Sequence, residues 1–274
     1  MGLIMNWDDY CKSNISKLKQ QYRQIHSTEL NLEHPVMFTE KLQWLKIFDS
    51  HMLKAVCADK IKVHQYYKSV LGTDIGIPII KVYDGVNSIT ESDIRQSCVI
   101  KCNHGSGMNI VLKDSVISLD EVKNRLTKWL STDHGKLFGE AYYSLIKPTI
   151  FAEQYLPDLR DVKVFCFNQK PLFYQIDQHL TEGRMNFYDL DWQPLTWLSN
   201  ASYPADYTII DEKPQIDVIY SYAEKLCKPF KFVRCDFVIS NRRIYGGELT
   251  FIPGAGNQKY IGDGDRRLGD LLAL

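Results

Sequence analysis

The spacing of hydrophobic residues in the first part of the chain is typical of helices. Apolar residues recur at intervals of three and four through residues 7–26 and again from Phe38 to Phe48, where Thr39 is predicted to cap the helix. A third helix is expected from about Asp59 to Gly72, because glycine is common at helix C-termini. The other face of the first helix is basic, and it either faces solvent or contacts an anionic polymer or membrane surface.

A strand–loop–strand pattern follows in the middle of the chain. After a short predicted strand at residues 77–83, the apolar runs 99–100 and 110–112 flank a loop that contains two glycines. Ser118 has the spacing of a capping box with Glu121, so a helix is expected from residue 119 to about residue 130. The glycine-containing segment 133–147 is expected to be irregular and mobile.

From residue 148 onward the pattern is mainly that of strands. Apolar runs and alternation predict strands at residues 149–155, 161–167, 171–178, 184–190, 231–239 and 243–250. One helix is predicted between them at residues 214–227, and a short helix at residues 267–272 closes the chain. The pattern therefore predicts an α/β (α+β) protein whose second half is built mostly of strands.

Polar residues near the C-terminus share one face of the predicted sheet. Arg234 and Asp236 alternate with apolar residues, and in the next strand Glu248 is followed at the same spacing by Thr250. A hairpin centred on Arg242 places Asp236 opposite Glu248. Two such carboxylates repel each other unless a hard cation such as Mg²⁺ lies between them, and the alternative is two solvated acids. We therefore expect the metal-free protein to tolerate the loss of either carboxylate without a lower melting temperature.

Composition and charge narrow the function classes. The chain has 33 Lys and Arg residues against 33 Asp and Glu residues, so its overall charge gives no reason to expect a nucleic acid partner. The start lacks the pattern of a signal peptide, and no apolar run approaches membrane-spanning length. The seven cysteines form no C-x-x-C pair, which is typical of reduced cysteines in a cytoplasmic protein.

The glycine-containing loop is a candidate phosphate site. Lys101 ends the strand before it, and the loop continues as His104-Gly105-Ser106-Gly107. Glycines allow backbone N–H groups to approach an anion, and the lysine can reach a phosphate held over the loop. The loop is neither a Walker A motif nor G-x-G-x-x-G, so a plain hairpin with an exposed lysine is the alternative.

Alternate positions of other predicted strands add charge that could line the same cleft. Lys163 shares a strand face with Asp161, and Arg184 has a similar position two strands later. The strand end Glu153-Gln154-Tyr155-Leu156 precedes a turn and could present backbone groups to a planar base. Taken together, the set describes a Mg²⁺–polyphosphate site made of Lys101, Lys163, Arg184, Arg234, Asp236 and Glu248.

The order of these residues resembles the ATP-grasp superfamily. The resemblance implies that ATP phosphates are held by Lys60, Lys101 and Lys163, with the loop His104, Gly105, Ser106 and Gly107. It implies that the segment Glu153, Gln154, Tyr155 and Leu156 binds adenine and that Asp161 binds the ribose. Arg234-x-Asp236 is similar to Arg-x-Asp of the superfamily, and Glu248-x-Thr250 to Glu-x-Asn, which implies one or two Mg²⁺ ions on Asp236, Glu248 and Thr250.

The closer resemblance is to the TupA-like ATP-grasp family, named for teichuronopeptide biosynthesis. It rests on Val99–Gly107, Asn186–Trp192 and Gly247–Phe251, and it covers nearly the whole chain. It implies a small lobe over residues 59–152 and a large antiparallel lobe over residues 153–274, with ATP between them. Two departures stand out, because Thr250 replaces an asparagine and a helical segment, residues 1–58, replaces the usual Rossmann-like domain.

The family resemblance also implies an activity. Such enzymes are thought to join an amino acid or amine to a hexuronic acid carboxylate of a bacterial surface or capsular polysaccharide, through an acylphosphate and with release of ADP. Arg234, Lys163 and Arg184 are the expected catalytic residues, and His104 and His179 are weaker candidates for a base. Peripheral association with the polysaccharide machinery stays open. The alternatives are a sugar or polyol kinase and a non-catalytic nucleotide- or polysaccharide-binding module, while the lack of a sugar-nucleotide motif disfavours a glycosyltransferase.

Overall fold

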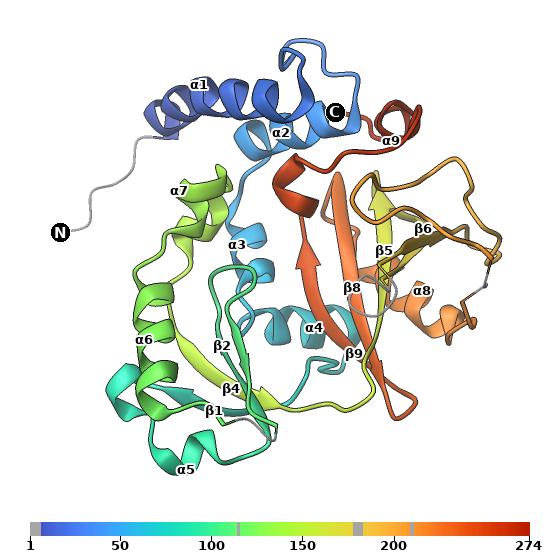
Figure 1. Ribbon diagram of the computed structural model, residues 1–274. Coiled ribbons are helices and arrows are strands. Elements are labelled where there is room, and N and C mark those ends of the chain that lie inside the picture. Colours follow the sequence, from blue (N-terminus) through green and yellow to red (C-terminus); the bar gives the residue numbers. More distant parts are fainter. Residues whose placement is uncertain (1–6, 114–115, 178–182, 209–210) are drawn as a thin grey trace.

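Two antiparallel sheets form the framework of the protein (Figure 1). The computed structural model describes residues 7–113, 116–177, 183–208 and 211–274, with side chains from residue 14 onward. The smaller sheet has the order β1 (Ile79–Tyr83), β4 (Ile150–Gln154), β2 (Cys98–Cys102), β3 (Asn109–Val111). The larger sheet has the order β7 (Met185–Tyr188), β6 (Lys170–Asp177), β5 (Arg160–Phe167), β8 (Phe232–Ser240), β9 (Arg243–Thr250).

Helices surround the two sheets (Figure 1). The longer ones are α1 (Trp7–His26), α2 (Phe38–Phe48), α4 (Val63–Leu71), α6 (Leu119–Leu130), α8 (Ile216–Leu226) and α9 (Gly264–Leu271). Shorter helical segments are α3 (Met52–Ala58), α5 (Glu91–Ile94), α7 (His134–Phe138), η1 (Val86–Ser88), η2 (Ala141–Leu145) and η3 (Pro253–Gly256). No helix among the described residues is long and apolar enough to span a bilayer.

The smaller sheet packs its buried face against α6. Ile100 and Ile110, which pair across the β2–β3 hairpin, join Val122 and Leu126 of α6 in one core cluster. The predicted cap of α6 is confirmed, because the Ser118 side chain accepts a hydrogen bond from the Glu121 backbone N–H. Residues 119–130 thus form the predicted amphipathic helix, and its apolar side covers the buried face of the smaller sheet.

The larger sheet is the main core of the protein. Phe165 of β5 packs against Phe173 of β6 and against Phe232 of β8, and Phe38 of α2 adds its ring with its centroid 5.1 Å from that of Phe232. Helix α8 covers this sheet with Ile219 and its other buried residues. Phe232 lies two residues before Arg234 in β8, and Phe165 pairs with Arg234, so the aromatic cluster lies on the same face as Arg234 and Asp236 and gives them a rigid support.

The packing divides the chain into two lobes at other residues than the sequence predicted. Helices α3 and α4 belong to the core of the larger sheet, where Tyr66 and Tyr67 are buried, and Gly246 of β9 donates its N–H to the Ile75 carbonyl. The expected boundary between residues 152 and 153 falls inside β4, which pairs with the smaller sheet through Glu153. Lys60, between α3 and α4, is therefore carried by the larger lobe.

Several local predictions are wrong. Helix α2 begins after Met37, and Thr39 does not cap it but donates its hydroxyl to Asp265 of α9. Phe48 at the end of α2 is 54% exposed, although the spacing placed it on the buried face. The expected helix from Asp59 starts only at Val63, because the Asp59 carboxylate accepts backbone N–H groups in the preceding turn. Segment 133–147 contains α7 and η2 instead of irregular structure.

Candidate active site

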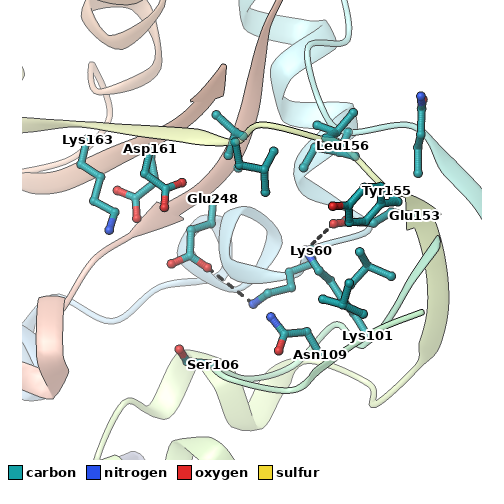
Figure 2. A pocket seen from close by; sticks show the side chains of 18 of the residues that line it. Lys60, Lys101, Ser106, Asn109, Glu153, Tyr155, Leu156, Asp161, Lys163 and Glu248 are labelled. Carbon is teal, nitrogen blue, oxygen red and sulfur yellow. Dashed lines mark ion pairs between the residues drawn. The ribbon is translucent and has the colours of Figure 1, made fainter. Parts of the chain in front are cut away.

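A cleft of about 450 Å³ lies between the two sheets. It is lined by Lys60 between α3 and α4, by strands β2 and β3, by the connection from β4 to β5, and by β8 and β9. Of the residues expected from the sequence, the cleft brings together Lys60, Lys101, Ser106, Glu153, Gln154, Tyr155, Leu156, Asp161, Lys163, Arg234, Asp236 and Glu248. Figure 2 shows the labelled members of this set converging on one space.

The register of the β8–β9 hairpin places its two carboxylates opposite each other. Asp236 pairs with Glu248 as predicted, but the hairpin is not centred on Arg242. Asn241 and Arg242 form the two-residue turn, both with positive φ, and Ser240 pairs with Arg243. The register then shifts by one residue at Gly247, which stands as a β-bulge before Glu248. The predicted pair is thus correct because the bulge compensates for the shorter turn.

A continuous polar network joins the carboxylates to Arg234. The guanidinium donates two hydrogen bonds to Asp236, of 2.7 Å from Nε and 2.6 Å from Nη2. The Thr250 hydroxyl lies 2.9 Å from Glu248 Oε1 and 3.2 Å from Asp236 Oδ2. Lys60 Nζ lies 3.6 Å from Glu248 Oε2, the ion pair dashed in Figure 2. Each carboxylate therefore already has a cation, and the two do not form an uncompensated repulsive pair.

The electrostatics of the network follow from burial and these cations. Burial favours the neutral acid of Glu248, but Lys60, Arg234 and the Thr250 hydroxyl outweigh it and lower the pKa of Glu248 to about 2. For Asp236 burial is the stronger effect and raises the pKa, while Arg234 opposes it. Glu248 is thus an ionised carboxylate at neutral pH, as a metal ligand must be.

Three lysines reach the cleft from different strands and loops. Lys60 Nζ donates to the Gly105 carbonyl at 2.7 Å, which ties it to the glycine-containing loop. Lys101 forms an ion pair with Glu153, which lies on β4 two residues from Phe151, the register partner of Lys101 (Figure 2). Lys163 lies opposite Asp236 in register and forms an ion pair with Asp177. Protein carboxylates or carbonyls thus orient all three lysine side chains before a polyanion binds in the cleft.

The other end of the cleft has apolar walls that the sequence analysis did not single out. Val99 and Val111 pair across the β2–β3 hairpin, and Ile77, Leu159 and Val238 complete the walls around residues 153–156. The alternation Val99–Lys101 and Asn109–Val111 was the available signal, since each pair lies on one strand face. An apolar slot beside a strand end suits a planar aromatic group.

Residues of the glycine-containing loop face two different parts of the protein, the cleft and the end of helix α6. Ser106 lines the cleft, and Gly107 has the positive φ of 71° that glycine tolerates. His104 is absent from the cleft lining, because it is buried with its Nε2 3.1 Å from the Trp129 carbonyl at the end of α6. The expectation that His104 faces ATP is thus not supported by its position, and the histidine anchors the loop to α6. His179 lies outside the described residues.

Arg184 is also placed away from the cleft lining. Its guanidinium donates two hydrogen bonds to Asp211, of 3.0 and 2.9 Å, and both residues are buried. Asn186 and Tyr188 donate to the same carboxylate. The alternation of β7 correctly placed Arg184 and Asn186 on one face, but the partner is an acid from a later loop. We therefore treat Arg184 as a structural residue.

The carboxylate pair fits a metal ion that binds together with a ligand. Among the described residues, no group of three or more His, Cys, Asp or Glu side chains could hold a metal. Mg²⁺ is usually bound through one or two carboxylates together with substrate phosphates. Asp236 and Glu248 supply such oxygens beside the cleft lysines, and Thr250 bridges them. The donor set therefore suits a nucleotide-bound Mg²⁺.

Several solved structures resemble the chain at low sequence identity. A biotin carboxylase from Campylobacter jejuni is 13% identical with a TM-score of 0.47, and the match covers 86% of this chain and 53% of that one. An L-amino acid ligase from Bacillus licheniformis is 11% identical with a TM-score of 0.48, over 89% and 56%. A D-alanine–D-alanine ligase from Bacillus anthracis, complexed with ATP, is 15% identical with a TM-score of 0.41, over 74% and 56%.

The comparison of sequences is more decisive. The chain spans about half the length of these solved relatives, and no curated protein matches it. A family profile described as TupA-like ATPgrasp matches residues 40–273, which is most of the chain. The match confirms the family resemblance drawn from the motifs, and with it the expected fold: the chain belongs to the TupA-like ATPgrasp family.

Proposed function

We propose that the protein is an ATP-dependent carboxylate–amine ligase. It joins an amino acid or amine to the carboxylate of a hexuronic acid in a bacterial surface or capsular polysaccharide or its precursor. The observation that carries this proposal is the cleft itself, which has apolar walls around residues 153–156 and a line of cations and carboxylates from Lys60 to Arg234. The family membership supports the same reaction class, and the hexuronic acid rests on the family resemblance alone.

Each residue has a distinct task in this proposal. The slot holds adenine, Asp161 holds the ribose, and Lys60, Lys101 and Lys163 hold the phosphates. Mg²⁺ bound at Asp236 and Glu248 would neutralise the charge of the phosphoryl group. Arg234, which lines the cleft and is held by two hydrogen bonds to Asp236, stabilises the acylphosphate and the oxyanion of amine attack. Preorganised charges of this kind stabilise a transition state by about 2.7–4 kcal/mol each.

In this proposal the reaction has two steps. The substrate carboxylate attacks the γ-phosphorus of ATP, the bond to the β-phosphate oxygen breaks, and ADP leaves. The amine then attacks the acyl carbon, and the bond from that carbon to the phosphate oxygen breaks. No protein nucleophile takes part. The products are an amide, ADP and inorganic phosphate.

The test is the fate of an oxygen label. The enzyme is incubated with ATP, Mg²⁺, an amino acid mixture and D-glucuronate or D-galacturonate labelled with ¹⁸O in the carboxylate. A ligase transfers one labelled oxygen into the released phosphate and forms ADP. A kinase would form ADP without free phosphate, and an adenylating enzyme would place the label in AMP. Absence of ADP with each acceptor, together with tight nucleotide binding, would favour a non-catalytic binding module.

A further inference from the structure

Two further pockets adjoin each other at the end of the molecule where α1 lies (Figure 1). The larger one, of about 460 Å³, lies between residues 200–203 and residues 254–259, and the smaller one, of about 390 Å³, lies between α1 and α7. Asn257 lines both pockets, so they form one groove, which we call the amide groove. Each pocket has the size of a small-molecule site, and the whole groove therefore suits an extended ligand of more than one unit.

Three amide side chains of the groove are oriented by the protein itself. Asn200 Oδ1 accepts a hydrogen bond from a main-chain N–H at 2.8 Å. Asn257 Oδ1 accepts one from Gln43 at 3.2 Å, and Gln258 Oε1 accepts one from the Tyr260 hydroxyl at 3.0 Å. Among the described residues, none of the three –NH₂ groups has an acceptor, so each is left as a donor for a ligand. Asn200 is only 3% exposed, and a buried donor without a partner calls for a ligand or a water molecule.

The charge of the groove favours an anion. Lys259 lines the larger pocket, and the linings of both pockets contain no aspartate, glutamate, histidine or arginine. In the part of the chain that the structure describes, no carboxylate forms an ion pair with Lys259. An ammonium group without a protein counter-ion, beside neutral amide donors, suits a ligand that carries a carboxylate.

Apolar and aromatic side chains complete both pockets. Tyr203 lines the larger pocket and is 38% exposed, while Leu137 and Phe138 line the smaller one. Sugar rings combine apolar C–H faces, which pack on such side chains, with hydroxyl groups, which accept hydrogen bonds from the amide donors. A chain of sugar acids therefore matches the apolar surfaces, the amide donors and the single ammonium group of the groove.

The amide groove lies close to the nucleotide cleft in the chain and in space. Segment η3, which carries Gly254 of the larger pocket, begins three residues after Thr250 at the end of β9. The Tyr260 hydroxyl donates to Gln258 of the groove. Burial raises the pKa of Tyr260, and the Arg234 guanidinium opposes this effect, so Tyr260 lies within electrostatic reach of Arg234 in the cleft lining. A ligand that is longer than one sugar unit can therefore extend from the cleft toward the groove.

We propose that the amide groove binds a chain of sugar acids, as the part of the acceptor that lies beyond the unit that reacts. The inference rests on the proposed function and names its acceptor as an oligosaccharide rather than a monosaccharide. No bond forms or breaks in the groove, because the reacting carboxylate lies in the cleft. A carboxylate of another unit pairs with Lys259, and the hydroxyl groups accept from the amide donors. Contacts remote from the reacting atoms contribute binding energy that holds the reacting unit in place.

Direct binding tests the groove. Calorimetry with Mg²⁺ and a non-hydrolysable ATP analogue is repeated with D-glucuronate and D-galacturonate, with a linear hexamer of each, and with maltohexaose, a neutral chain of the same length. We expect one of the charged hexamers to bind about tenfold or more tightly than its monosaccharide and than maltohexaose. Lys259→Gln should weaken binding of this hexamer about tenfold, because a charge-assisted hydrogen bond is lost.

A second variant and a control complete the binding experiment. Ser202→Trp places a large ring in the larger pocket at an exposed position and should weaken binding of the hexamer by steric exclusion. Lys225→Gln removes an exposed lysine outside both pockets and should leave the affinity for the hexamer unchanged. In all three variants the affinity for the ATP analogue should stay within about twofold of wild type.

Turnover separates the groove from the cleft. Phosphate release is measured with each hexamer and its monosaccharide, and Lys259→Gln should lower the ratio of their kcat/KM values about tenfold through the KM for the hexamer. Hexamers that bind no more tightly than their monosaccharides or maltohexaose would overturn the proposal, as would unchanged affinity in both Lys259→Gln and Ser202→Trp. Tight binding of poly-L-glutamate that is lost in Lys259→Gln would assign the groove to an acidic peptide instead. Failure of the ATP analogue to bind, or absence of turnover with every acceptor, would overturn the proposed function.

Discussion

The ion pair between Arg234 and Asp236 gives the sharpest prediction about stability. The sequence suggested that removal of Asp236 would relieve repulsion from Glu248. In the structure, Asp236 accepts two hydrogen bonds from Arg234, and both residues are only 8% exposed. Asp236→Ala would leave the guanidinium with Thr250 Oγ1, at 3.3 Å, as its remaining contact in this network. We therefore expect the metal-free variant to be less stable than the wild type.

The size of the effect follows from burial. Removing one partner of a buried ion pair costs about 3–5 kcal/mol, because the other charge stays in a medium of low polarity. For a chain of this size, each kcal/mol corresponds to roughly 2–4 °C, so the melting temperature should fall by roughly 6–20 °C. Removing both charges with residues of similar volume is often nearly neutral. The double variant Arg234→Met/Asp236→Leu should therefore recover most of the loss.

The assay is thermal or urea unfolding in buffer with a metal chelator. The two single variants, the double variant and the wild type form a double-mutant cycle that isolates the coupling of the pair. Asp270→Ala is the control, because its ion pair with Arg266 is exposed and should contribute less than about 1 kcal/mol. Single variants that melt within about 2 °C of wild type would show that the pair is not buried as described.

Three further predictions concern other charged residues. Lys101→Ala should weaken binding of an ATP analogue about 10–100-fold by calorimetry without loss of fold, and unchanged affinity would remove Lys101 from the phosphate site. Arg184→Met should lower the melting temperature while the affinity for the ATP analogue is retained, because the partner of Arg184 is Asp211. An unchanged melting temperature with a weaker affinity for the analogue would instead place Arg184 in the cleft. Asp93 has a pKa lowered to about 2, since hydrogen bonds from Lys81 and others outweigh burial, so its contribution to stability is present above about pH 4 and is lost toward pH 2. In Asp93→Asn, the free energy of unfolding measured between pH 4 and pH 2 should lack this loss. A pH dependence of stability equal to that of the wild type would contradict the lowered pKa of Asp93.

The strand pattern predicted much of the fold and the site because it depends on local alternation. The faces of β8 and β9, and hence Arg234, Asp236, Glu248 and Thr250, follow directly from side chains that alternate at every second residue. The β2–β3 hairpin and the Ser118 cap are equally local. These features are fixed by neighbours within a few residues, so a single sequence is enough to find them.

Other features depend on partners far apart in the sequence, and these were missed. Arg184 looked like a cleft residue because nothing near it in sequence shows Asp211 as its partner. Lys101 and Glu153 were given separate tasks, yet they form one ion pair across β2 and β4. Helix α7 has glycines inside and just beyond it, and its stability comes from packing rather than from helix propensity.

The bulge at Gly247 divides the β8–β9 hairpin into two segments of opposite phase. On the turn side, Gly246 pairs with Phe237 and lies against the Tyr67 ring, which a Cβ there would meet at 2.7 Å. On the other side, Glu248 pairs with Asp236 and faces the cleft. In a regular strand, residues two positions apart lie on the same face. Without the extra residue, Gly246 and Glu248 would therefore face the same side of the sheet. The bulge thus lets one strand place a close aromatic contact and a cleft-facing carboxylate on opposite faces of the same sheet.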